Sequence, residues 1–202
     1  MKLFYSPTSP YVRKVMVILH ETDQLQDVSL EETSGTPLAP ATGLAAKNPL
    51  TKVPALERPD GCTLYDSRVI CRFLDARADA GLYPSGARGW ETQTLEATGD
   101  GITDAALLMT YESRLRPEAQ QMEAFVDGQW AKIENACAAL NARWISHLSG
   151  PLDAGQIAVA CALAYVDFRH DARGWRKGND ALANWYASFA ERDSMTATVP
   201  PA

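Results

Sequence analysis

Residues 1–14 read Met1-Lys-Leu-Phe-Tyr-Ser-Pro-Thr-Ser-Pro-Tyr-Val-Arg-Lys14. The pattern predicts a short strand over Leu3–Tyr5, a turn that ends at Ser9, and a helix that Pro10 opens. Serine is a preferred helix cap, and proline fits the first helical position because its missing N–H would be unpaired there. The Ser9 hydroxyl is therefore expected beside backbone N–H groups at the positive end of a helix dipole, which favours an anion such as a thiolate. The alternative is that Ser9 only caps the helix.

The composition is that of an ordinary soluble globular protein. Of the 202 residues, 46% are hydrophobic and 22% are charged. No apolar run approaches the roughly 20 residues that span a bilayer, and no secretory signal pattern is present, so we expect a cytoplasmic protein. The net charge of −6 argues against a general nucleic-acid-binding surface.

Two domains are predicted, because the character of the chain changes near residue 80. Residues 1–78 alternate strand and helix patterns, and their acidic and basic side chains balance. Residues 79–87 contain Gly and Pro and read as a linker. Residues 88–202 carry the excess of acidic side chains and show only helical patterns.

The expected elements follow from hydrophobic periodicity and turn residues. After the first strand and helix, the first domain is expected to contain strand 27–30, an irregular helix within 31–50, strands 53–56 and 62–65, and helix 67–78. Strands 53–56 and 62–65 should form an antiparallel hairpin, because Arg58-Pro-Asp-Gly61 is a tight turn. The second domain is expected to contain helices 88–114, 118–148, 153–169 and 179–191. The apolar face expected for the first helix comprises Val12, Val15, Met16 and Leu19.

The cysteines and histidines indicate neither a metal site nor a disulfide motif. The four cysteines form no C-x-x-C pair, so neither a zinc site nor a redox dithiol is expected. Cys71, Cys137 and Cys161 fall in apolar helical patterns and are expected to be buried and reduced. The three histidines lie far apart, and each is expected at a helix end or on the surface.

Two further motifs in the first domain could contact a peptide-like ligand. Val53-Pro54 precedes a strand, and a cis bond there would leave the Val53 N–H and C=O available to an extended peptide. The alternative is a simple edge-strand proline. Asp66 and Ser67 begin a helix that Ser67 can cap. The Ser67 hydroxyl and nearby backbone N–H groups could hold a carboxylate, and Asp66 could accept from an ammonium. The alternative here is capping alone.

A third motif, Asp153-Ala-Gly-Gln156, precedes the apolar run of the third helix of the second domain. It has an acceptor at the cap position and Gln three residues later, which is the pattern of a capping box. We therefore expect a structural role for it.

Taken in order, these motifs resemble the cytosolic glutathione transferases, over nearly the whole chain. The likeness is nearest to the bacterial serine-type members with a Ser-Pro-x-Ser-Pro-x-x-Arg-Lys opening. It implies a thioredoxin-like N-terminal domain with a mixed four-stranded sheet that binds glutathione, followed by an all-helical domain that supplies the pocket for the second substrate. The chain departs from the family at Asp153 and Gln156, where the usual box is Ser or Thr, two residues, then Asp.

The resemblance implies a role for each motif in binding glutathione as co-substrate, with no metal. Ser9 would hydrogen-bond the glutathione sulfur. A cis Pro54 would let the Val53 backbone pair with the glutathione cysteine. Asp66 and Ser67 would hold the γ-glutamyl group. The glycine carboxylate would face Lys52, with Lys47 and Asn48 as further candidates.

The expected reaction is attack of the glutathione thiolate on an apolar electrophile, a detoxifying conjugation. No cysteine stands at the Ser9 position, which disfavours disulfide reduction. Arg13 could add positive potential near the sulfur or be a solvated helix charge. Candidates for an apolar electrophile pocket between the domains are Tyr11, Leu108, Tyr111 and Trp175.

The resemblance also implies a homodimer, in which Asp100 and Asp104 could approach the partner's glutathione. Two other functions remain open. The chain could be a non-enzymatic relative that binds a protein partner, or a glutathione-dependent isomerase, dehalogenase or peroxidase.

Overall fold

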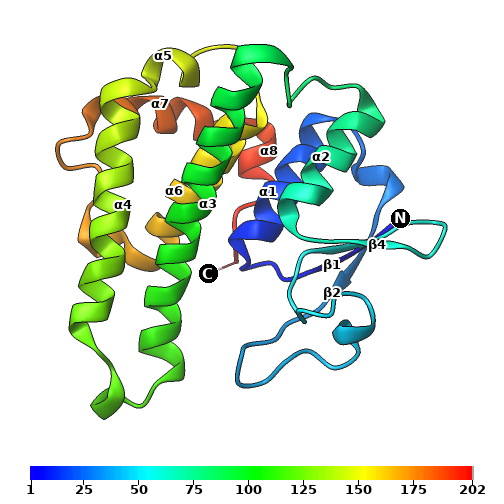
Figure 1. Cartoon of the computed structure of the whole chain (residues 1–202), viewed down its shortest axis with the longest axis horizontal. Coiled ribbons are helices and arrows are strands. Elements are labelled where there is room, and N and C mark those ends of the chain that lie inside the picture. The colour runs from blue at the N-terminus through cyan, green and yellow to red at the C-terminus, as the bar shows by residue number, and fades with distance from the viewer. Residues whose placement is uncertain (202) are drawn as a thin grey trace. The chain divides into compact units, whose positions relative to one another are not determined.

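The computed structural model describes residues 1–201, which form two compact units (Figure 1). The first unit comprises Met1–Pro84 together with the C-terminal segment from Asp193, and the second comprises Ser85–Arg192. The sequence division had assigned the whole of 88–202 to the helical part. The chain end differs because its last helix packs on a helix of the first unit.

A four-stranded mixed sheet forms the centre of the first unit, as expected. Its strands are β1 (Lys2–Tyr5), β2 (Ser29–Glu32), β3 (Ala55–Glu57) and β4 (Thr63–Leu64), in the order β2-β1-β3-β4. β1 pairs parallel with β2 and antiparallel with β3, and β3 pairs antiparallel with β4. The predicted hairpin is therefore confirmed. The second strand begins two residues later than predicted, because the 3-10 turn η1 (Leu25–Asp27) precedes it.

Different segments of the chain cover the two faces of this sheet. Phe4 packs with Leu44 and Ala55 on the face covered by the segment that contains η2 (Leu44–Ala46). Successive strand side chains point to opposite faces, so the fully buried Leu3 points the other way. On that side lie α1 (Pro10–Glu21) and α2 (Ser67–Ala78), which pack against each other.

The buried face of α1 differs in part from the prediction. Val12, Val15 and Leu19 are buried as expected, but Met16 is only half-buried, and Ile18 is buried in addition. Lys14 is also buried on this helix. The face is therefore wider than the four predicted positions.

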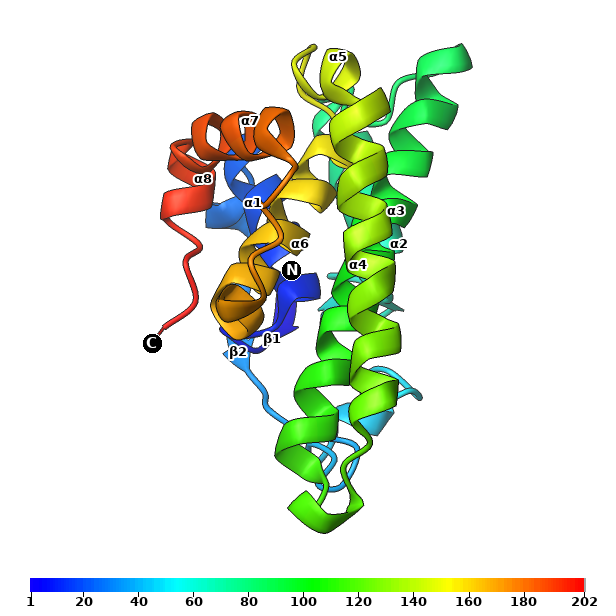
Figure 2. The same ribbon diagram turned by 90° about the vertical axis from the view of Figure 1, so that its left-hand side faces the viewer.

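The second unit is all-helical. Its helices are α3 (Gly86–Leu115), α4 (Glu123–Arg143), α5 (Ile145–Leu148), α6 (Ala154–His170) and α7 (Asp180–Ala190), with the 3-10 turns η3 (Glu118–Gln120) and η4 (Asp171–Arg173). The single helix predicted over 118–148 is wrong: η3 stands apart from α4, and Trp144 separates α4 from α5. Figure 2 shows α3 and α4 running side by side.

Helix α6 is the centre of this unit, because every residue from Ala154 to Val166 is buried. Its first turns approach α3 very closely. A Cβ at Gly99 of α3 would lie 2.6 Å from the Ala158 carbonyl carbon, and a Cβ at Gly155 of α6 would lie 2.7 Å from the Thr92 carbonyl oxygen. The two helix backbones meet at these glycines, with no room for a side chain between them.

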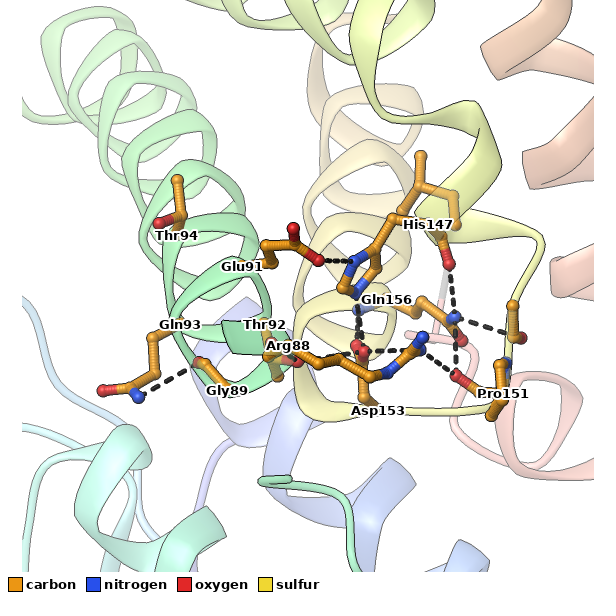
Figure 3. Close-up of polar contacts among 12 residues, drawn as sticks. Arg88, Gly89, Glu91, Thr92, Gln93, Thr94, His147, Pro151, Asp153 and Gln156 are labelled. Atoms are coloured by element: carbon orange, nitrogen blue, oxygen red, sulfur yellow. Dashed lines mark hydrogen bonds and ion pairs between the residues drawn. The ribbon is translucent and has the colours of Figure 1, made fainter. Parts of the chain in front are cut away.

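The α6 N-terminus is held by a buried carboxylate (Figure 3). Asp153 caps the helix by accepting from the Gln156 N–H at 3.1 Å, as the capping-box motif predicts. Its other oxygen accepts from Thr92 (3.0 Å) and Arg88 (3.1 Å), and lies 2.7 Å from the His147 ring. One side chain therefore connects α3, α5 and α6.

The second arm of this motif differs from a capping box. The Gln156 side-chain amide donates to the carbonyl oxygens of His147, Gly150 and Pro151 instead of reaching back to the cap. His147 stands at a helix end as predicted. It is nearly buried there and also contacts Glu91 at 3.2 Å.

Asp153→Asn is expected to lower the free energy of unfolding by about 2–3 kcal/mol, because it keeps the cap acceptor but removes the charge that Arg88 and His147 face. Denaturant titration measures this loss. The matched control is Asp127→Asn, which breaks the exposed pair with Arg173 and should cost under about 0.5 kcal/mol. Equal losses in the two variants would contradict the account.

The cysteines lie as the sequence predicted. Cys71, Cys137 and Cys161 are buried, Cys62 is exposed, and none of these four forms a disulfide bond. Burial raises the pKa of the Cys137 thiol to about 12, helped by the charges of Asp167 and Glu134. Within residues 1–201, no group of three or more metal-binding side chains is gathered, and no helix is long and apolar enough to cross a bilayer.

Candidate functional site

Three chain segments lie at one end of the sheet, where β1 and β4 end and β3 begins. The strand pairing sets Phe4 opposite Ala55 and Leu56 opposite Leu64. Continued along the strands, this register brings Pro54 between the end of β1 and Asp66, which follows β4. The loop after β1 leads directly to Ser9. The motifs at Ser9, Val53-Pro54 and Asp66-Ser67 therefore lie at the same end of the sheet.

Ser9 is the N-cap of α1, as predicted. Its hydroxyl oxygen accepts from the Val12 N–H at 3.4 Å, and its backbone N–H donates to the Ser6 carbonyl at 3.0 Å. Within residues 1–201 the Ser9 hydroxyl hydrogen has no acceptor, and the residue is half-buried. The Ser9 hydroxyl oxygen thus accepts a hydrogen bond from the helix, while its hydrogen can still be donated to an anion at the helix terminus.

The Val53–Pro54 peptide bond is cis. Val53 precedes β3, so its backbone N–H and C=O lie outside the strand ladder. The preceding loop is shaped by Asn48, which is 2% exposed. The Asn48 amide donates to the Lys52 carbonyl at 2.8 Å and accepts from the Leu50 N–H at 3.0 Å.

The contacts of Asn48, Lys47 and Lys52 distinguish these three candidates for the glycine carboxylate of glutathione. Asn48 is buried within its loop, and Lys47 forms an ion pair with Glu57. Lys52 is exposed and forms no ion pair within residues 1–201. Of the three, Lys52 alone presents an ammonium that no carboxylate of the described chain neutralises.

Asp66 and Ser67 begin α2, and the cap is Asp66, not Ser67 as predicted. Asp66 is the cap and accepts from the Arg68 N–H at 3.0 Å, whereas Ser67 is the first helical residue and is buried. The Arg68 side chain donates to the Asp66 carboxylate at 2.7 Å. This hydrogen bond holds the pKa of Asp66 below its usual value, with a smaller contribution from Lys14. Asp66 is therefore ionised at neutral pH, and it is exposed.

The ion pair between Arg68 and Asp66 and the burial of Lys14 were not predicted from the sequence. The Arg68 pair could have been suspected from its two-residue spacing, but the burial of Lys14 has no local signal. Arg13 is not the solvated helix charge that was one alternative for it, because its guanidinium donates to the Met195 carbonyl at 3.0 Å.

The four candidate electrophile contacts have different surroundings. Leu108 on α3 is 43% exposed, and Tyr111 on the same helix is half-buried, which raises the pKa of its hydroxyl. Tyr11 on α1 is also half-buried. Trp175 is 2% exposed, and its indole donates to Asp167 at 2.7 Å. Trp175 therefore packs in the interior of the helical unit, where its ring makes a T-shaped contact with Tyr186.

Comparison with known families agrees with this arrangement. The family model "Glutathione S-transferase, N-terminal domain" matches residues 3–82, and "Glutathione S-transferase, C-terminal domain" matches residues 123–188. The chain belongs to the glutathione S-transferase family. The resemblance seen in the sequence is thereby confirmed, and with it the succession of a thioredoxin-like and an all-helical domain.

This family member has similar relatives over its full length. The GST-like protein YibF of Escherichia coli K12 is 32% identical, with 100% of this chain and 99% of YibF covered. A glutathione transferase family member from Pseudomonas fluorescens Pf-5, solved with bound glutathione, is 47% identical, with a TM-score of 0.97 over 100% of this chain and 99% of that one. A glutathione S-transferase from Methylobacillus flagellatus KT, solved with glutathione bound, is 36% identical, with a TM-score of 0.88 over 99% of both chains.

Proposed function

We propose that this protein is a glutathione transferase in which Ser9 stabilises the glutathione thiolate for attack on an apolar electrophile. One observation carries the proposal: the Ser9 hydroxyl stands at the α1 N-terminus with its hydrogen available for donation. It lies at the same end of the sheet as Val53-Pro54 and Asp66-Ser67. The glutathione-bound relatives support the choice of ligand.

The remaining motifs account for the rest of the tripeptide. The Val53 backbone pairs with the cysteine of glutathione, beside the cis Pro54. Asp66 accepts from the γ-glutamyl ammonium, and Ser67 with the first N–H groups of α2 holds the γ-glutamyl carboxylate. Lys52 faces the glycine carboxylate. The ligand thus meets an acceptor for its cation and donors for its anions.

The chemical step needs only a modest shift in the thiol pKa. A free thiol has a pKa of about 8.5, so about 3% is ionised at neutral pH. A decrease of about two units makes the thiolate the major form and corresponds to about 2.7 kcal/mol. A hydrogen bond to a charged group contributes roughly 1.5–3 kcal/mol, so Ser9 with the helix terminus suffices.

The bonding changes are simple. The thiol proton leaves to solvent, and the sulfur lone pair forms a bond to the electrophilic carbon. In a substitution, the electron pair of the broken bond leaves with the leaving group. In an addition, the electron pair of the π bond moves away from the attacked carbon and is then protonated from solvent. Ser9 donates throughout and keeps its own proton. For the electrophile we propose contacts with Tyr11, Leu108 and Tyr111, which are at least partly accessible.

We also propose a cytoplasmic homodimer acting in detoxification. Several large apolar side chains are exposed, and two of them could be covered by a second copy: Trp90 on α3 is 72% exposed and Val69 on α2 is 45% exposed. Sedimentation of the purified protein, compared with Trp90→Glu, tests the dimer.

Asp66→Asn is expected to weaken glutathione binding roughly tenfold or more, because a charge-assisted hydrogen bond to the ammonium is lost. Isothermal titration calorimetry with glutathione measures the change in Kd. Asp60→Asn is the matched control. Asp60 also accepts from a nearby N–H and pairs with an arginine, Arg58, but it lies in the β3–β4 turn.

The control variant should bind glutathione as the unaltered protein does. Unchanged binding by Asp66→Asn would place the ammonium elsewhere. Absence of glutathione binding by the unaltered chain would refute the transferase proposal and leave a protein-binding role.

A further inference from the structure

The chain end returns to the helix that Ser9 caps. The last helix, α8 (Asp193–Thr196), packs on α1, and both ribbon views show the two side by side (Figures 1 and 2). Met195 is 1% exposed. The Ser194 hydroxyl donates to Glu21 at the far end of α1. The C-terminal segment is therefore part of the first unit and is seated along α1.

Arg13, in the first turn of α1, holds the C-terminal segment by two hydrogen bonds. Its Nη2 donates to the Met195 carbonyl at 3.0 Å, and its Nε lies 3.4 Å from the Thr198 hydroxyl oxygen. Thr198 in turn donates to the Ser194 carbonyl at 2.8 Å. The planar guanidinium fork reaches two acceptors at once, which a lysine ammonium on a flexible stem cannot reproduce.

The same arginine is bonded to the cap through its backbone. The Arg13 N–H donates to the Ser9 carbonyl at 3.0 Å, which closes the first turn of α1. The other bond that fixes this turn, from the Val12 N–H to the Ser9 hydroxyl, is long at 3.4 Å. First turns of helices have few internal bonds and fray readily. An external restraint on Arg13 therefore acts on the residue that orients Ser9.

We propose that Arg13 and residues 193–198 form a C-terminal strap that fixes the first turn of α1 and so aims the Ser9 hydroxyl at the glutathione sulfur. The strap rests on the proposed function. Arg13 is a positioning residue in it, because its side chain is turned to the chain end and acts on the ligand only through Ser9.

The strap predicts a change in the pH dependence of catalysis. With Arg13→Met, the glutathione thiol should be stabilised less as a thiolate, so kcat at neutral pH should fall about threefold to tenfold, which lies in the lower part of the range for coupling within one hydrogen-bond network. The loss should shrink as the pH rises past the thiol pKa, where the thiolate forms without help. KM for glutathione should change little.

A double-variant cycle separates the strap from a direct effect of charge. Thr198→Ala removes one acceptor of Arg13 and should give a smaller loss of the same kind. A chain that ends at Arg192 removes the strap altogether, and in it Arg13→Met should have no further effect. Arg13→Lys should resemble Arg13→Met, because the charge alone is not sufficient. Arg173→Met, whose partner Asp127 lies on α4, is the control and should leave the pH profile unchanged.

Two results would overturn the strap. One is an equal effect of Arg13→Met in the full and shortened chains, which would mean that Arg13 acts by its charge on the ligand. The other is a loss of thermal stability with no change in the pH profile, which would make the contact merely structural.

A second readout does not depend on glutathione. Amide hydrogen exchange at Val12 and Arg13 reports the first turn of α1 directly, and Arg13→Met should accelerate it. Unchanged exchange would refute the strap even in a chain that binds no glutathione, so failure of the strap and failure of the transferase proposal are distinguishable.

Discussion

Ser9→Ala is expected to lower kcat for glutathione conjugation about 25-fold at neutral pH, while the Kd for glutathione rises by only about fourfold. A thiol pKa that returns from about two units below 8.5 to that value lowers the thiolate from about three-quarters to about 3% of the bound glutathione. The shift corresponds to about 2.7 kcal/mol, within the roughly 1.5–3 kcal/mol of a hydrogen bond to a charged group. Affinity is largely retained because Val53, Asp66 and Lys52 contact other parts of the tripeptide. Stopped-flow kinetics and calorimetry give the two quantities separately.

Two further variants make this experiment specific. Ser9→Thr retains a hydroxyl and should recover most of the activity. Ser6→Ala alters a serine of the same loop that contacts Ser9 only through its backbone carbonyl, and should have little effect. The loss of the α1 cap costs about 1 kcal/mol of stability, which thermal unfolding measures independently. An equal loss in affinity and turnover, or none, would mean that the sulfur is activated by another group.

Gly99→Ala is expected to destabilise the helical unit by about 3 kcal/mol or more, or to prevent its folding. Overpacking of a core costs typically 1–3 kcal/mol, and here the added Cβ would meet backbone atoms of Ala158 and Val159 at 2.6–2.8 Å. Backbone cannot move aside as a flexible side chain can, so α3 and α6 would have to separate. Denaturant titration of the purified variant measures the loss.

The same helix provides the control. A Cβ at Gly101 meets nothing within 4 Å. Gly101→Ala should therefore stabilise the protein by about 0.5–1 kcal/mol, the helix-propensity difference between the two residues. If both variants lose stability alike, the close approach of α3 and α6 at Gly99 does not exist in solution.

Local chemistry explains which features the sequence predicted well. The Ser9 cap, the Pro10 helix start and the turn at Arg58–Gly61 depend on residues next to one another in the chain. The resemblance to glutathione transferases adds the long-range order of the motifs. Together they suffice to predict the mixed sheet and the helical half, and to place Ser9 and Asp66 on helix termini.

The features that were missed depend on contacts between distant residues. The partners of Arg13 lie more than 180 residues along the chain, so no local pattern could distinguish a tether from a solvated charge. Trp175 gave an apolar signal that fits a pocket wall and a core equally. The break at Trp144 has no Gly or Pro near it in the sequence, because none occurs between Gly128 and Gly150.

The most direct test is a titration of the thiol of bound glutathione, followed by the ultraviolet absorbance of the thiolate. The account predicts a pKa about two units below the ordinary value of about 8.5 in the unaltered protein, and a return to nearly that value in Ser9→Ala. A bound thiol that titrates like free glutathione, or one whose lowered pKa survives the loss of the Ser9 hydroxyl, would contradict it.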